Sequence, residues 1–143
     1  MHSFYKHCAY FSAAHYMRRI EKIAAAIFRP TGLAPAYSYI MLYLEDYGSS
    51  SITDIAVNLG YDRTTVSRLV KKLRDKQLVR LKNVGRKTMV NISSEGKIFL
   101  ITANQCLNEL SDKTDYILQE DKGKMTALLS KNTQKLQEYT YYE

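Results

Sequence analysis

Basic and hydroxyl-bearing residues between positions 62 and 76 offer the clearest chemistry in this sequence. The apolar residues of the stretch recur at helical spacing and are Val66, Leu69, Val70 and Leu73. With about 100° between successive residues, the opposite face carries Thr64, Ser67, Arg68 and Lys71, and Arg63 lies at its margin. Such side chains hydrogen-bond to base edges and pair with phosphates. The pattern predicts a helix that enters the major groove of duplex DNA.

The charge of the chain is concentrated around the same stretch. The 143 residues carry a formal net charge of +7, and residues 61–87 alone contain ten basic and two acidic groups. Basic composition by itself suits nucleic acid, an anionic membrane surface or an acidic protein equally well. A solvated basic face is the ordinary explanation of such a run. Here the run coincides with a helix, a glycine turn before it and a basic hairpin after it, which favours duplex DNA.

A predicted hairpin extends the basic surface. Leu78–Leu81 and Thr88–Ile92 alternate as strands do, and the turn between them spans Asn83–Arg86. A basic hairpin tip can place an arginine in a narrow minor groove, and Arg86 is the candidate for this contact. The predicted DNA-binding residues are Thr53, Arg63, Thr64, Thr65, Ser67, Arg68, Lys71, Lys72, Arg86 and Lys87.

The cysteines and histidines give weaker indications of function than the basic residues do. Cys8 and Cys106 have none of the spacings of a zinc site or a disulfide framework. Cys8 has two interpretations: a redox-sensing thiol activated by His7 and Lys6, or a small apolar residue buried at an interface. Cys106 is interpreted as a core residue. The three histidines lie close together in the sequence without a second ligating segment, so no metal site is predicted.

Tyrosines gather on the first two predicted helices. A pocket between dimerisation helices and a DNA-binding region could use them as aromatic walls for a small aromatic ligand. The candidate pocket residues are Tyr10, Tyr16, Tyr39 and Tyr43. The alternative, packing in the core or in an interface, is the more usual role of such residues.

Signatures of other protein classes are missing from the sequence. It contains no Gly-rich phosphate loop, no Gly-x-Ser-x-Gly and no Cys-x-x-Cys, so neither an enzyme activity nor a cofactor is predicted. A protein-interaction or architectural module remains an alternative, although such modules usually lack a basic helix and hairpin. No apolar run approaches the roughly 20 residues that span a bilayer, and no signal peptide is recognisable. We therefore expect a cytoplasmic protein without a membrane partner.

The elements that position these residues follow from the same periodicities. One long helix is predicted over residues 5–29, and a second runs from Pro35, at its first position, to about Tyr47. A short strand is predicted at Ser51–Ile52. Thr53 is the predicted N-cap of the third helix and Asp62 that of the fourth.

Two long helices complete the chain. The first opens at Ser93 or Ser94 and runs to about Leu118, and the second covers residues 124–142. This order predicts a mainly α fold, a winged helix-turn-helix with a two-stranded wing. We expect a single domain over residues 1–143, with a DNA-binding region at 33–96 and dimerisation helices at 4–32 and 97–143. The apolar stripes of those helices exceed what the small DNA-binding region can cover, which indicates a second copy of the chain.

The segment from about Leu33 to Gly96 resembles the MarR family of bacterial transcriptional regulators. The resemblance is carried by Leu33–Pro35, Ile52–Gly60, Asp62–Leu73, Leu78–Arg80 and Ile92–Gly96. It implies a homodimer built from the N- and C-terminal helices that binds a near-palindromic operator. It also implies a repressor that a small ligand, or in some members thiol oxidation, releases from DNA.

Two positions depart from the family pattern. Val84 stands where the family usually has an aspartate that steadies the wing arginine, so Arg86 is expected to be more mobile here. Ala34 replaces the usual hydroxyl N-cap of the second helix, which should cost that helix about 1 kcal/mol and leave DNA contact unaffected.

Overall fold

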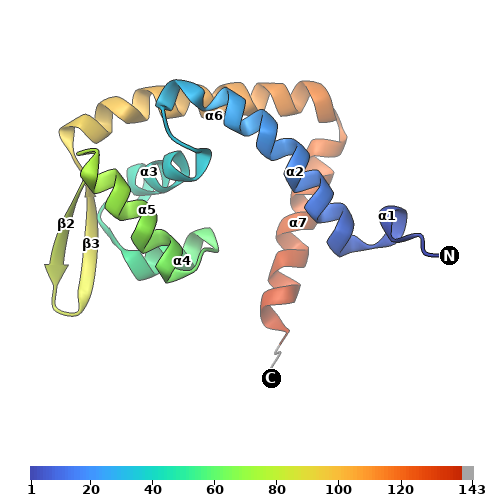
Figure 1. The fold of residues 1–143 in the computed structure, drawn as a ribbon, viewed down its shortest axis with the longest axis horizontal. Helices are drawn as coiled ribbons and strands as arrows, with labels where there is room; N and C mark the ends of the chain where they lie inside the picture. Colours follow the sequence, from blue (N-terminus) through green and yellow to red (C-terminus); the bar gives the residue numbers. More distant parts are fainter. Residues whose placement is uncertain (140–143) are drawn as a thin grey trace. The chain divides into compact units, whose positions relative to one another are not determined.

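The computed structural model describes residues 1–139, and the predicted end of the last helix near Tyr142 lies outside them (Figure 1). Two compact units make up the chain, residues 1–107 and residues 108–143. The elements are α1 (Phe4–His7), α2 (Ala9–Ile27), the 3-10 helix η1 (Arg29–Thr31), α3 (Pro35–Tyr47), β1 (Ser50–Ser51), α4 (Ile52–Leu59), α5 (Arg63–Asp75), β2 (Val79–Val84), β3 (Lys87–Ile92), α6 (Ser94–Leu118) and α7 (Asp121–Glu138). Within residues 1–139, no helix is both long and apolar enough to cross a membrane.

The N-terminal segment contains two helices, and the prediction of one continuous helix over residues 5–29 was wrong. The backbone is extended at Cys8, with φ −87° and ψ 114°, and the thiol sulfur accepts a hydrogen bond from the Phe11 amide at 3.5 Å. The rings of Phe4 and Phe11 meet edge to face across this break, with centroids 5.0 Å apart. A capping contact and an aromatic pair thus stabilise a corner that periodicity does not reveal.

Helix α3 supplies much of the core of the first unit. Pro35 occupies its first position, and Ala34 is the N-cap without a side-chain hydrogen bond, both as predicted. Ile40, Met41 and Leu44 are almost fully buried. They pack with the apolar stripes of α4 and α5, so α3 is the support on which the two helices of the helix-turn-helix rest.

The N-cap of α4 is Ser51, which corrects the prediction that Thr53 has this role. The Ser51 hydroxyl oxygen accepts a hydrogen bond from the Asp54 amide at 3.0 Å, and Thr53 lies exposed in the first turn. The short strand was also predicted one residue late, because Ser51 ends β1 and Ile52 already begins the helix. Both errors have one cause: Ser and Thr are almost equally good caps, so the sequence alone does not choose between them.

We expect Ser51→Ala to lower the free energy of unfolding by about 1 kcal/mol, because the Asp54 amide loses its only capping partner. Thr53→Ala should change it by less than about 0.5 kcal/mol, because Thr53 is exposed and caps nothing. Urea unfolding followed by circular dichroism at one protein concentration measures both. Equal losses in the two variants would contradict the assignment of Ser51.

Helix α5 begins at Arg63, one residue after its N-cap Asp62. Asp62 has the extended backbone of an N-cap, but its carboxylate makes no capping hydrogen bond, contrary to prediction. The predicted apolar stripe is confirmed: Val66, Val70 and Leu73 are fully buried and Leu69 nearly so. The turn from α4 into α5 uses Gly60 in the left-handed region at φ 75°, which other residues rarely adopt.

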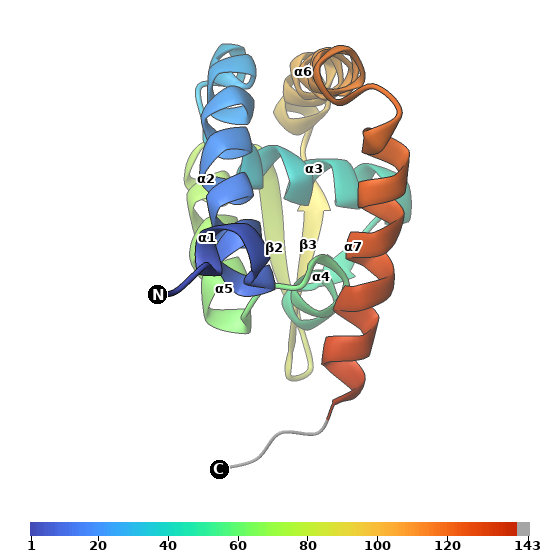
Figure 2. The same ribbon diagram turned by 90° about the vertical axis from the view of Figure 1, so that its right-hand side faces the viewer.

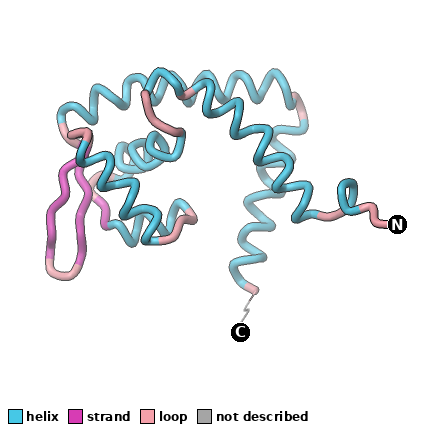
Figure 3. The backbone as a smooth tube through the Cα atoms, in the orientation of Figure 1, coloured by secondary structure: helices cyan, strands magenta, loops and turns pink. Residues whose placement is uncertain are grey.

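The wing is a two-stranded hairpin to which β1 adds a third, short strand (Figure 3). The strand order is β1-β3-β2, all pairs are antiparallel, and Val84 lies opposite Lys87. The turn therefore consists of Gly85 and Arg86, shorter than the predicted tip. Gly85 has φ 63°, as the first position of a tight hairpin turn requires. Figures 1 and 2 both show the turn extending beyond α4.

Hydrogen bonds of the Ser93 side chain stabilise the base of the wing. Its hydroxyl donates to the Gln77 carbonyl at 2.6 Å and accepts from the Gly96 amide at 3.0 Å, so one side chain joins the end of α5 to the start of α6. Gln77 adopts φ 65° in this connection. Gly96 lies directly against the Leu78 carbonyl oxygen. The orientation of the wing relative to α5 is set by these contacts.

The second unit contains the end of α6 and all of α7. The predicted division near residues 120–123 is confirmed, but α7 begins at Asp121, three residues before the predicted Lys124. Gly123 therefore lies inside the helix. The Lys122 amine pairs with Asp115 at 2.7 Å and donates to the Ser111 carbonyl at 3.0 Å. These contacts tie the first turn of α7 to the last turns of α6.

Candidate nucleic-acid interface

A groove of about 780 Å³ runs along the exposed face of α5. Its lining residues come from α4, α5 and β3 and are Ile52, Arg63, Thr64, Ser67, Arg68, Lys71, Lys72, Asp75 and Thr88. Six of the ten predicted DNA-binding residues are thereby brought together: Arg63, Thr64, Ser67, Arg68, Lys71 and Lys72. Arg63, placed at the margin by helical geometry, lies within the lining. The DNA-binding role of these residues stays a prediction.

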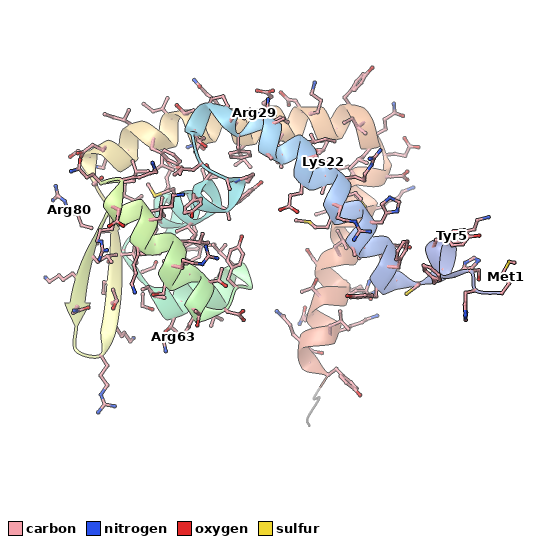
Figure 4. The ribbon with its side chains drawn as sticks, viewed as in Figure 1. Met1, Tyr5, Lys22, Arg29, Arg63 and Arg80 are labelled. Atoms are coloured by element: carbon pink, nitrogen blue, oxygen red, sulfur yellow. The ribbon has the colours of Figure 1, made fainter. Side chains whose placement is uncertain are left out.

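Burial of the opposite face of α5 determines which of its side chains line the groove. Because Val66 and Val70 are fully buried, residues displaced by about half a turn, such as Arg68, must face outward. Arg63 lies at the N-terminal end of α5, on the same side of the unit as the hairpin turn (Figure 4). Unpaired amides at that end of a helix add donors that suit phosphate. One end of the groove thus combines a guanidinium with a helix N-terminus.

A second hollow of about 350 Å³ continues the surface between α5 and the wing. It is lined by Ile52, Ser67, Lys71, Arg74, Leu81, Asn83 and Thr88. The Thr88 hydroxyl donates to the Asn83 side-chain oxygen at 3.2 Å across the two strands. Sequence reasoning missed Arg74, Asn83 and Thr88, although Arg74 follows Lys71 by three residues and the strand register places Asn83 opposite Thr88.

Four predicted residues lie outside both hollows. Thr53 is exposed on α4, and Thr65 is half-buried on the flank of α5. Arg86 occupies the hairpin turn and Lys87 the first position of β3, and both are exposed. Arg80, in contrast, projects from the other end of the wing (Figure 4). The basic residues of the hairpin turn therefore lie apart from the groove rather than within it.

Two groove residues, Lys72 and Asp75, have intramolecular partners, and only the second of these contacts compensates a positive charge. The Lys72 amine lies 5.5 Å from the centre of the Tyr37 ring, a cation–π contact. Asp75, at the far end of α5, pairs with Arg74 at 3.1 Å. Arg63, Arg68 and Lys71 form no ion pair with any residue of the described part of the chain. The uncompensated positive charge is thus concentrated on the N-terminal two-thirds of the groove.

Tyrosines line a separate cavity of about 510 Å³ in the first unit. Its walls are Tyr39, Leu42, Tyr43, Asp46, Tyr47, Asn58, Leu59 and Leu107; we call it the tyrosine cavity. Tyr39 and Tyr43 are two of the four predicted pocket residues, whereas Tyr10 and Tyr16 are not part of the lining. Burial, assisted by the nearby Tyr61, raises the pKa of the Tyr39 hydroxyl above its ordinary value, so this group stays neutral.

The cysteines differ in environment. Cys106 is buried, as predicted, and Cys8 is partly exposed as the N-cap of α2. Redox sensing by Cys8 stays a prediction. Among residues 1–139, no group of three or more His, Cys, Asp or Glu side chains is arranged to hold a metal ion.

The segment that contains the groove is similar to a known protein family. Residues 31–87 match the model of the MarR family. No curated protein matches the sequence. The predicted family resemblance is confirmed over the helix-turn-helix, β2 and the hairpin turn, which contain every lining residue of the groove except Thr88.

Three solved structures are similar over almost the whole chain. BpsR of Bordetella bronchiseptica, whose DNA binding is regulated by 6-hydroxynicotinic acid, has a TM-score of 0.76 at 21% identity, over 94% of this chain and 98% of its own. The M. tuberculosis regulator MosR, in complex with DNA, has a TM-score of 0.81 at 18% identity, over 91% of this chain and 96% of its own. Sco5413, a MarR family transcriptional regulator of Streptomyces coelicolor, has a TM-score of 0.81 at 18% identity, over 97% of this chain and 100% of its own. These likenesses confirm the predicted winged-helix fold.

Proposed function

We propose that the protein, whose residues 31–87 match the model of the MarR family, is a sequence-specific, duplex-DNA-binding transcriptional regulator. The observation that carries the proposal is the groove along α5, where basic side chains without an ion-pair partner lie beside the hydroxyls of Thr64 and Ser67. Arginine and lysine read guanine edges, and hydroxyls adapt to several bases. A MarR family model and a readout surface thus coincide on the same residues.

The mechanism follows from the placement of the side chains. Thr64, Ser67, Arg68 and Lys71 contact base edges and nearby phosphates in the major groove, and Arg63 binds phosphate at the start of α5. The turn of the wing carries Arg86 and Lys87 toward the adjacent minor groove or the phosphates beside it. The Thr88–Asn83 hydrogen bond joins the two strands beside this turn, but Arg86 lacks the aspartate that the family usually has at the position of Val84.

We further propose that the protein acts as a homodimer. Ile98 and Ile101 on α6 are 68% and 62% exposed, and α7 exposes Leu128, Leu129 and Leu136. Exposed apolar side chains on both helices favour association, and a two-fold dimer presents two copies of α5 to a near-palindromic operator. In this organisation residues 33–96 bind DNA, and residues 4–32 and 97–143 dimerise within one domain over 1–143.

The biological role follows from the same assignment. We propose a cytoplasmic repressor, without enzyme activity, that a small ligand releases from its operator. BpsR, whose DNA binding a small aromatic acid regulates, supports ligand control in a protein of this fold. A protein-interaction module is disfavoured, because its groove would not need the uncompensated charges of Arg63, Arg68 and Lys71.

Selection of bound sites from random duplex DNA tests the proposed function. We expect enrichment of a near-palindrome whose half-sites are about one helical turn apart. Affinity for the selected site should fall steeply with salt, because basic side chains displace counterions from phosphates. Binding measured by fluorescence anisotropy at several salt concentrations gives the slope. Failure to enrich any sequence, with salt-independent residual binding, would refute a DNA-binding role.

A further inference from the structure

The tyrosine cavity lies between α3 and the end of α4, and α6 contributes Leu107. Leu42, Leu59 and Leu107 make part of its lining apolar. The rings of Tyr43 and Tyr47 are next to each other, with centroids 4.8 Å apart and planes inclined by 39°, and form an aromatic wall. A volume of about 510 Å³ suits a small organic molecule with one ring.

The cavity lining contains one carboxyl group and no basic side chain, and its three tyrosine hydroxyls can both donate and accept hydrogen bonds. Asp46 is the one acidic residue of the lining; it is exposed and forms no ion pair within residues 1–139. The side-chain amide nitrogen of Asn58 already donates to the Tyr43 hydroxyl at 3.0 Å and to the Asp54 carbonyl at 2.9 Å. Its side-chain oxygen is the group left for a ligand. No lysine, arginine or histidine lines the cavity.

We infer that the tyrosine cavity binds an organic cation that carries an aromatic or similarly sized apolar group. The ring of such a ligand packs on the leucines, while its ammonium lies near the Asp46 carboxylate and the faces of Tyr43 and Tyr47, where cations are attracted. An aromatic carboxylate of the same size meets the Asp46 charge and the negative ring faces without a basic partner. The site therefore selects by the sign of the ligand's charge.

A ligand in the tyrosine cavity is expected to affect DNA binding through α4. Asn58 and Leu59 form the last turn of α4, and only Gly60, Tyr61 and Asp62 separate that turn from α5. A ligand that binds more tightly when α4 moves away from α3 would displace α5 with it. This consequence rests on the proposed function, whereas binding of the cation itself does not.

Titration calorimetry without DNA tests the inference, with benzylammonium, benzyl alcohol and benzoate as probes of equal ring size and different charge. Benzylammonium should bind at least about tenfold more tightly than benzoate, with benzyl alcohol between them. Tyrosine fluorescence gives a second readout, because the chain has twelve tyrosines and no tryptophan. Equal or tighter binding of benzoate, or no binding of any probe, would overturn the inference.

Asp46→Asn should weaken benzylammonium about fivefold and leave benzyl alcohol unchanged. Glu21→Gln, which removes the same charge from an exposed position on α2 outside the cavity, should change neither. If Asp46→Asn binds benzylammonium as tightly as wild type does, the assignment of a cation-selective site is wrong.

With wild-type protein on its selected DNA site, saturating benzylammonium should reduce the affinity of the protein for DNA. Ligand binding without that reduction would refute the coupling through α4, and absence of DNA binding altogether would refute the proposed function while leaving the cavity assignment intact.

Discussion

Arg68→Ala is expected to weaken binding to the selected operator by about 1–3 kcal/mol, a loss of about five- to 150-fold. Arg68 is exposed near the middle of α5 and lines the groove together with Ser67 and Lys71. No carboxylate pairs with its guanidinium within the described residues, so its five donors are available to a base edge. A bidentate contact to guanine should also make the selected sequence less specific at one position of each half-site.

The control for this variant is Arg18→Ala. Arg18 is exposed on α2 and carries the same charge without lining either hollow of the DNA-binding surface. It separates a local contact from the general effect of net charge, which acts through long-range attraction and is screened by salt. Fluorescence anisotropy on the selected site and on a scrambled duplex measures both variants. Equal losses for Arg18→Ala and Arg68→Ala, or the same loss on both duplexes, would exclude a base contact by Arg68.

Gly96→Ala is expected to lower the free energy of unfolding by about 3 kcal/mol, at the upper end of what overpacking costs. A Cβ atom on Gly96 would collide with the Leu78 carbonyl oxygen, and would also lie 2.9 Å from Ile92 Cγ2 and 3.0 Å from Met41 Cε. The carbonyl belongs to the backbone and accepts the Ser93 amide at 3.1 Å, so it cannot move away without breaking the base of the wing. Urea unfolding at fixed protein concentration gives the change.

Gly123→Ala provides the matched control, because the same methyl group is added in open space. Gly123 lies inside α7, and a Cβ there meets no atom within 4 Å. The exchange should raise stability by about 0.5–1 kcal/mol, since glycine loses more chain entropy in a helix than alanine does. The two substitutions therefore have opposite signs. A Gly96→Ala protein as stable as wild type would contradict the close contact between α6 and the start of β2.

Periodicity and charge alone identified the parts of this protein that depend on local sequence. The stripe of Val66, Leu69, Val70 and Leu73 fixed the orientation of α5, and hence the outward face with Arg68 and Lys71, before any tertiary contact was known. A helix can bury only one face, and four regularly spaced apolar residues leave little choice of which face it is. The fold class and the family resemblance from about Leu33 to Gly96 followed from the same local signals, and the family model matches residues 31–87.

Tertiary structure decided the features that depend on segments distant in sequence. The separation of Tyr10 from Tyr39 is one such feature. The Cys8 break and the choice of Ser51 over Thr53 are local, and spacing did not reveal them because alternative caps compete at nearly equal energy. Only the strand register brought Asn83 and Thr88 into the surface beside α5. The sequence determined which face of α5 is exposed. Packing of α3, α4 and the wing around that helix determined which side chains lie beside it, since distances between remote segments arise only when the core closes.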